Sequence, residues 1–75
     1  MKQKTVRGKV RKERGKDSWY INYCCSGRRD AVHFGKRQDG KYLCYAGAHC
    51  WYADSFDEAV KTCRDEIARI GGFVD

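Results

Sequence analysis

The sequence predicts a small α+β domain in which an antiparallel sheet of three or more strands carries one C-terminal helix on a single face. Apolar residues recur at helical spacing in residues 56–70, and shorter stretches before them alternate between apolar and polar side chains. Turn sequences containing glycine separate those stretches. The 75 residues form one domain, 1–75, near the lower size limit for a self-supporting core. Residues 1–4 are expected to be a disordered basic start.

The first expected strand is the segment TVRGKVRK, residues 5–12. Its valines share one parity and its basic residues share the other, as on the two faces of a strand. A disordered tail has no reason to alternate, although so short a pattern can also arise by chance. The following ERGKD has the length and the glycine of a hairpin loop, so a strand is favoured over a tail. The two faces hold Val6 and Val10 on one side, and Arg7, Lys9 and Arg11 on the other.

The next expected strands are SWYINYCC, residues 18–25, and AVHF, residues 31–34, with SGRRD as the turn between them. The first of the two is rich in aromatic and β-branched residues, which favour strands. Alternate residues in both strands are suited to a core face. The side chains expected on that face are Trp19, Ile21 and Tyr23 from the earlier strand, and Val32 and Phe34 from the later one.

A tight hairpin is expected at QDGK, residues 38–41, because Asp-Gly is a strong signal for a two-residue turn. With that dipeptide at the centre, Phe34 faces Tyr45 in the following strand, and Leu43 joins the core face. The segment DGKYLCYAGAHCWYA, residues 39–53, therefore adds at least one strand to the sheet.

The C-terminal segment predicts an amphipathic helix from Phe56 to Ile70. Ser55 is a natural N-cap, and Glu58 three residues later completes a capping box. The glycines at 71–72 end the helix. Because an isolated helix of this length is marginal in water, its apolar stripe must cover the sheet. The stripe consists of Phe56, Ala59, Val60, Cys63, Ile67 and Ile70.

The net charge of +6 is unevenly distributed along the chain. Residues 1–16 hold eight basic side chains and one acidic one, whereas the other 59 residues hold eight basic and nine acidic ones. This asymmetry indicates that the basic side chains bind a polyanion, and it is less typical of basic side chains that only keep the chain soluble.

With the helix on one face, the other face of the sheet is predicted to be bare and to carry basic, amide and aromatic side chains. Lys and Arg neutralise phosphates, and Arg and Asn can contact guanine or adenine through paired hydrogen bonds. The sequence therefore predicts a protein that binds duplex DNA through a basic sheet face. The expected contact residues are Arg7, Lys9, Arg11, Tyr20, Asn22 and His33 on that face, and Arg28 and Arg29 in the turn.

The segment RGKVRKERGKDSWYINYCCSGRRDAVHF, residues 7–34, resembles the N-terminal arm-type DNA-binding domain of phage tyrosine recombinases, which is similar in fold to the plant AP2 domain. The resemblance starts at Gly8, passes through Trp19 and the turn at 27–29, and reaches the helix start at 56–59, covering about half of the chain. It implies a sheet that enters the major groove with the helix packed behind it. It also implies an accessory or regulatory protein of a phage or mobile element.

Two other partners remain open. A small inhibitor or adaptor that binds a host protein would use aromatic and Arg side chains as anchors, with residues 42–52 as its interface. The same aromatics are equally suited to filling a core, because a small domain needs all of them. RNA is the other alternative, since exposed Tyr20, Tyr42 and His33 can stack on unpaired bases, although the sequence contains no RNP-like motif.

Composition also sets expectations about chemistry and location. Five cysteines without a Cys-x-x-Cys pair fit reduced thiols better than a disulfide framework, and their spacing matches no standard zinc motif. We expect no metal, no cofactor, no small-molecule substrate and no enzymatic activity, because no nucleophile has an evident base. The sequence shows neither a membrane span nor a signal peptide, so the expected location is cytoplasmic, with no membrane partner.

Overall fold

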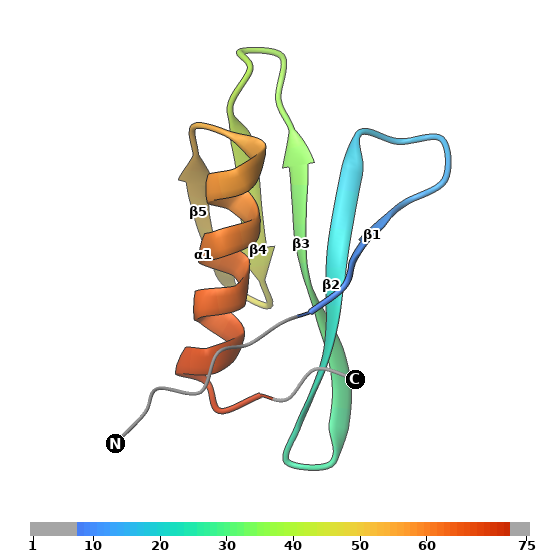
Figure 1. Ribbon diagram of the computed structural model, residues 1–75, viewed down its shortest axis with the longest axis vertical. Helices are drawn as coiled ribbons and strands as arrows, with labels where there is room; N and C mark the ends of the chain where they lie inside the picture. Colours follow the sequence, from blue (N-terminus) through green and yellow to red (C-terminus); the bar gives the residue numbers. More distant parts are fainter. Residues whose placement is uncertain (1–7, 73–75) are drawn as a thin grey trace.

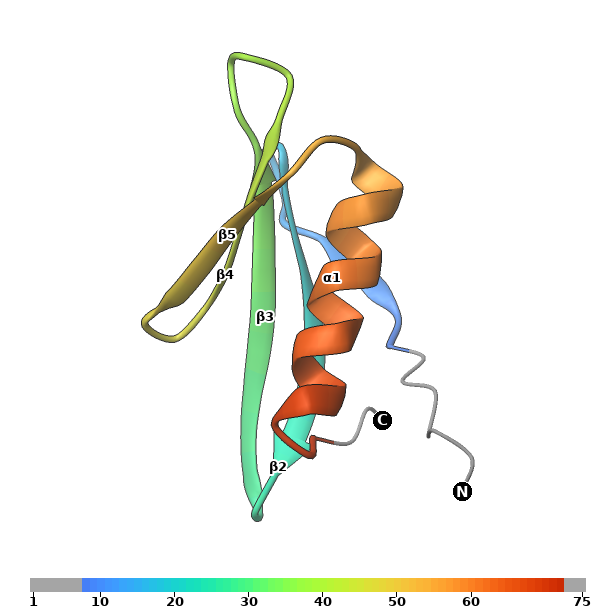
Figure 2. The same cartoon turned by 90° about the vertical axis from the view of Figure 1, so that its left-hand side faces the viewer.

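The computed structural model describes residues 8–72, and it has two layers, a five-stranded antiparallel sheet and one helix (Figures 1 and 2). The strands lie in the order in which they occur in the chain, so each pairs with the next through a hairpin. The α+β class and the single C-terminal helix on one face are as predicted. The elements are β1 (Val10–Lys12), β2 (Ser18–Cys25), β3 (Arg28–Lys36), β4 (Tyr42–Ala46), β5 (His49–Ala53) and α1 (Phe56–Arg69).

The basic N-terminal segment pairs with the aromatic strand through residues 10–12. In this part of the chain the prediction of a strand, and not of a tail, is confirmed. In β1, Val10 lies opposite Ile21 and Arg11 lies opposite Tyr20. Just before β1, the carbonyl of Gly8 accepts a hydrogen bond of 2.8 Å from the Arg64 guanidinium of α1. The rest of the predicted strand, with Val6 and Arg7, lies outside the described residues, as does the basic start at 1–4.

The turn between β2 and β3 is shorter than predicted, and this corrects the position of both arginines. Ser26 and Gly27 have φ angles of 53° and 76°. Positive φ at both central residues is the geometry of a two-residue type I′ turn, whose twist matches that of the flanking strands. The ladder consequently continues to the pair Cys25 and Arg28, so Arg28 and Arg29 belong to β3 rather than to a loop.

The predicted register between β3 and β4 is wrong by one residue. The Arg37 amide donates to the Lys41 carbonyl over 2.7 Å, and the Gly40 amide donates to the Arg37 carbonyl over 3.2 Å. Gly40 has a φ of 85°, so a turn is followed by one left-handed glycine, and the loop has three residues instead of two. Phe34 therefore faces Cys44 and not Tyr45.

A shift of one residue exchanges the two faces of a strand. In β4, Cys44 points to the helix side and is fully buried, and Tyr42 packs against the core from the same side. Leu43 and Tyr45 take the opposite side. The predictions that Leu43 is a core residue and that Tyr42 is exposed for stacking were therefore wrong.

The core lies between α1 and the sheet. Trp19 borders it and stacks on Phe34, with ring centroids 5.5 Å apart, and meets Phe56 of the helix edge to face at 5.2 Å. The predicted core face of β2 and β3 is thus the observed one. The buried apolar residues are Ile21, Tyr23, Val32, Phe34, Cys44, Ala53, Ala59, Cys63 and Ile67.

The helix begins and ends as its sequence predicts, within one residue. The Glu58 amide donates to Ser55 Oγ over 3.1 Å, and the Glu58 carboxylate accepts from the Asp54 amide over 3.0 Å. At the other end the Gly72 amide donates to the Ile67 carbonyl over 2.9 Å. Within residues 8–72, this helix falls short of the length and apolar character needed to cross a bilayer.

Candidate nucleic-acid interface

The face of the sheet opposite α1, called here the open face, carries one continuous row of side chains. Successive strand pairs bring one residue from each strand into line, perpendicular to the strands. Because neighbouring side chains of a strand alternate in direction, all five point away from the helix. We call these five residues the central row: Arg11, Tyr20, His33, Tyr45 and Cys50.

Aromatic contacts hold the middle of the central row together. The rings of His33 and Tyr45 are nearly parallel, with centroids 5.2 Å apart and planes 11° apart. Tyr20 flanks His33 from the other side, with centroids 6.1 Å apart. Tyr45 remains 39% exposed. The row therefore presents a flat aromatic surface that ends in a cation at Arg11.

His33 also has an acidic neighbour. Its Nδ1 atom lies 3.6 Å from Oε1 of Glu13, and both side chains are about one-third exposed. Among the residues that the structure describes, this buried nitrogen makes no hydrogen bond. Glu13 therefore places one carboxylate beside the centre of an otherwise basic and aromatic face.

One end of the β2–β3 hairpin extends past its neighbours. Strand β1 pairs with β2 only as far as Ile21, and β4 pairs with β3 only from His33 onward. Residues 22–31 thus form a two-stranded ribbon, called here the β2–β3 ribbon, which protrudes beyond the lower end of the helix in Figure 2.

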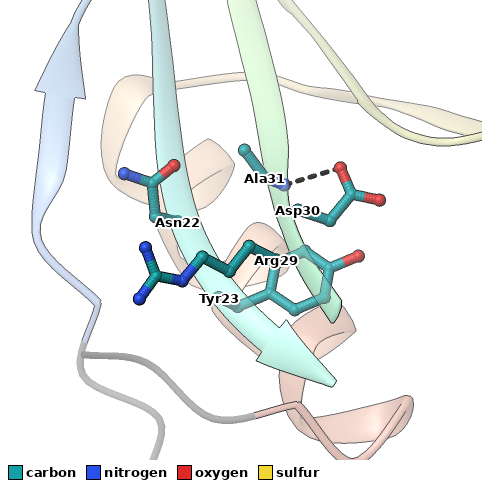
Figure 3. Close-up of a pocket in the computed structure, with 5 residues that line it drawn as sticks. All are labelled: Asn22, Tyr23, Arg29, Asp30 and Ala31. Atoms are coloured by element: carbon teal, nitrogen blue, oxygen red, sulfur yellow. Dashed lines mark hydrogen bonds between the residues drawn. The ribbon is translucent and has the colours of Figure 1, made fainter. Parts of the chain in front are cut away.

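The two sides of the β2–β3 ribbon carry different groups around a shallow hollow of about 370 Å³ (Figure 3). Asn22 and Arg29 belong to the open face, and their amide and guanidinium extend to the same side of the ribbon. Tyr23 and Asp30 form a cross-strand pair on the other side. Arg28 shares that second side by alternation, so it is separated from Arg29.

The Tyr23 side of the hollow carries a neutral phenol. Burial raises the pKa of the Tyr23 phenol, and the nearby Asp30 carboxylate raises it further. Asp30 Oδ1 accepts a hydrogen bond of 2.8 Å from the Ala31 amide. The amide of Asn22 and the guanidinium of Arg29 are the hydrogen-bonding groups on the other side of the ribbon.

A second aromatic and basic pair lies at the opposite end of the open face. Tyr52 of β5 is 59% exposed, and the Arg37 guanidinium lies over its ring, 4.9 Å from the centroid. Arg37 also pairs with Asp39 at 3.4 Å. Cationic groups thus lie at three margins of the aromatic surface, at Arg11, Arg29 and Arg37.

Most predicted contact residues share one face, but they divide into two groups. Arg11, Tyr20 and His33 lie in the central row, and Asn22 and Arg29 lie on the β2–β3 ribbon. Arg28 lies on the other side of the sheet, Lys9 is exposed just before β1, and Arg7 is outside the described residues. Sequence reasoning did not place Tyr45, Tyr52, Arg37 or Glu13 at the nucleic-acid interface. A three-residue reading of the QDGK loop would have predicted Tyr45, and Tyr52 would also have required the two-residue turn at 47–48.

No group of three His, Cys, Asp or Glu side chains within residues 8–72 is arranged to hold a metal ion. Comparison with family models, curated proteins and solved structures finds no match to this chain.

Proposed function

We propose that this protein binds duplex DNA, with the β2–β3 ribbon as the element that enters the major groove. The observation that carries the proposal is the protrusion of this ribbon, with Asn22 and Arg29 on one side of it. The charge asymmetry of the chain and the arginines at the margins of the open face add to it.

The dimensions of the sheet favour the ribbon over the whole face. Neighbouring strands are about 4.8 Å apart, so five strands span roughly 19 Å. The major groove is about 12 Å wide and accepts a helix or a two-stranded ribbon. The predicted mode of binding, in which the basic sheet face docks as a unit, is therefore refined to docking through residues 22–31.

The polar side chains of the ribbon and of the basic N-terminal segment then have two distinct roles. The amide of Asn22 can pair with the edge of adenine and the guanidinium of Arg29 with that of guanine, which gives sequence preference. Lys9, Arg11 and Arg28 neutralise backbone phosphates and set the orientation. Arg7 belongs to this second group as a proposal from the sequence alone.

A titration of DNA at several salt concentrations tests this proposal. If about four phosphates are neutralised, log affinity should fall against log salt with a slope of about −4. Replacing Arg7, Lys9 and Arg11 by Ala should weaken binding to every duplex and flatten the slope, whereas Arg29→Ala should cost about 1–3 kcal/mol on a preferred sequence only. Lys61→Ala, on the solvent side of α1, is the matched control, and it should change neither the affinity for DNA nor the slope against salt.

The central row favours single-stranded nucleic acid as a second candidate ligand. Tyr45, Tyr20 and His33 form an aromatic platform on a sheet, and unpaired bases stack on such platforms with about 1–3 kcal/mol for each base. The same titration with an unpaired oligonucleotide distinguishes single-stranded nucleic acid from duplex DNA as the ligand. Tyr45→Ala should weaken only single-stranded binding, whereas Arg29→Ala should weaken mainly duplex binding.

We propose a binding role without catalysis, in a cytoplasmic setting such as gene regulation in a phage or mobile element, as the resemblance implies. His49 and Cys50 are neighbours in β5 and point to opposite faces, so they do not form a nucleophile and base. If neither nucleic acid binds, a host protein partner for the exposed Tyr45 and Tyr52 becomes the leading function.

A further inference from the structure

Strand β5 ends the sheet, and its outer edge is uncovered. No described strand or loop lies beyond it (Figure 1). Two residues, Gly47 and Ala48, connect β4 to β5, so the pair Ala46 and His49 that closes the hairpin exchanges both of its main-chain hydrogen bonds. Hydrogen-bonded and non-bonded pairs alternate from there.

This alternation identifies the groups that face outward. The main chain of His49, Trp51 and Ala53 bonds to β4, whereas the amides and carbonyls of Cys50 and Tyr52 point away from the sheet. Within residues 8–72, the main chains of Cys50 and Tyr52 have no hydrogen-bond partner outside the hairpin.

The β5 edge also lacks the features that usually prevent edge pairing. Natural edge strands are kept apart by charged side chains, proline, bulges or very short length. At the other edge, β1 has only three residues, and two of them are basic. In contrast, the β5 sequence HCWYA contains no Lys, Arg, Asp, Glu or Pro, although 35% of the chain is charged.

We propose that β5 pairs antiparallel with β5 of a second copy of this chain, about a twofold axis at Trp51. In this register Cys50 lies opposite Tyr52 of the other copy, and every outward donor on one strand meets an outward acceptor on the other. No formally charged side chains of β5 face each other across the axis. The two five-stranded sheets become one continuous sheet.

The helices fit this arrangement. The Trp51 indole donates to Thr62 Oγ1 over 2.9 Å, which places the middle of α1 beside the axis. The two copies of α1 then lie antiparallel on the same side of the joined sheet, so their dipoles oppose each other favourably. Both open faces lie on the other side, with Tyr52 of each copy beside Cys50 of its partner.

The dimer does not depend on the proposed function, but it would add a symmetry requirement to the proposed DNA binding. Two β2–β3 ribbons related by a twofold axis would favour a DNA site with matching twofold symmetry. That consequence rests on the duplex proposal. The test below uses protein alone, so a failure of dimerisation and a failure of DNA binding are separate results.

Sedimentation of the full chain, under reducing conditions and from about 1 µM to about 1 mM, tests the association. The mass should rise with concentration from 8.7 kDa toward twice that value. Amide exchange measured by NMR should show protection of Cys50 and Tyr52 that grows in step with the dimer.

Two matched variants test the edge. Tyr52→Lys places a charge on the pairing strand and should weaken association by about tenfold or more. Tyr45→Lys places the same charge on the same face, but in β4 instead of the edge strand β5. It should change the dimer dissociation constant less than about twofold. A chain that stays monomeric over the whole range overturns the proposal. So does a dimer in which both amides exchange rapidly, or one that Tyr52→Lys leaves intact while the variant stays folded.

Discussion

Phe34 lies directly opposite Cys44, and both side chains are fully buried under α1. This pair sets the direction of every side chain in β4, because a strand shifted by one residue turns each of them to the other face. It is the reason that Tyr45 stacks on His33 instead of entering the core.

The register can be tested with one charge at neighbouring positions. Cys44→Lys places an ammonium group at a fully buried position beside Cys63, where it loses its hydration, and should prevent folding or lower the free energy of unfolding by more than about 3 kcal/mol. Leu43→Lys places the same group on the open face and should cost about 1 kcal/mol or less. Urea unfolding of both variants measures the difference; equal losses would mean that the register is not the one described.

Trp19 is expected to be a major contributor to stability. It stacks on Phe34 and meets Phe56, so Trp19→Ala removes contacts between the sheet and the helix and should cost about 3 kcal/mol. Tyr52→Ala removes an exposed ring of similar size and should cost less than about 1 kcal/mol. Thermal and urea unfolding provide the comparison, and a Trp19 loss no larger than that of Tyr52 would contradict its place at the core.

The hydrogen bond between Trp51 and Thr62 links β5 to α1. Thr62→Val has nearly the same shape but no acceptor, so it leaves the indole N–H unpaired and should cost about 1–3 kcal/mol. Thr62→Ser keeps the oxygen and serves as the control. Indole fluorescence and the free energy of unfolding should both change in Thr62→Val and stay close to the parent values in Thr62→Ser. Equal effects of the two substitutions would show that the hydrogen bond contributes nothing to stability.

Glu66 is expected to make stability depend on acid pH. Its carboxylate is largely buried, and two hydrogen bonds from Arg69, of 2.7 and 2.8 Å, lower its pKa below the ordinary value of 4.5. A lowered folded-state pKa means that the unfolded chain binds the proton first as pH falls. The contribution is therefore complete above pH 4.5 and is lost below it.

Glu66→Gln should accordingly be less stable than the parent at neutral pH, and the two should converge as the solution is acidified below that value. Asp65→Asn removes a neighbouring carboxylate that is exposed and pairs with Lys61, so it should change the loss of stability at acid pH little. Unfolding free energies between pH 7 and about pH 3 measure the effect. A constant gap between parent and Glu66→Gln would contradict it.

Local patterns were sufficient for the class of fold and for most of the core. The capping box at Ser55, the apolar stripe of α1 and the alternation around Trp19 and Ile21 depend on neighbours in the chain, and the structure agrees with all of them. The same alternation placed Arg11, Tyr20, Asn22 and His33 together on the open face. A charge pattern alone could not choose between DNA, RNA and protein as the partner, because each can match a basic and aromatic surface.

Turn geometry and strand order are features that only the tertiary structure decided. Asp39-Gly40 is compatible with loops of two and of three residues, and burial of Cys44 against α1 rather than Leu43 selects the longer one. Ser26-Gly27 closes the other hairpin in two residues, which separates Arg28 from Arg29 across the sheet. The aromatic row and the uncovered β5 edge follow from pairing between distant segments, and a pairing register is determined by which side chains the helix buries.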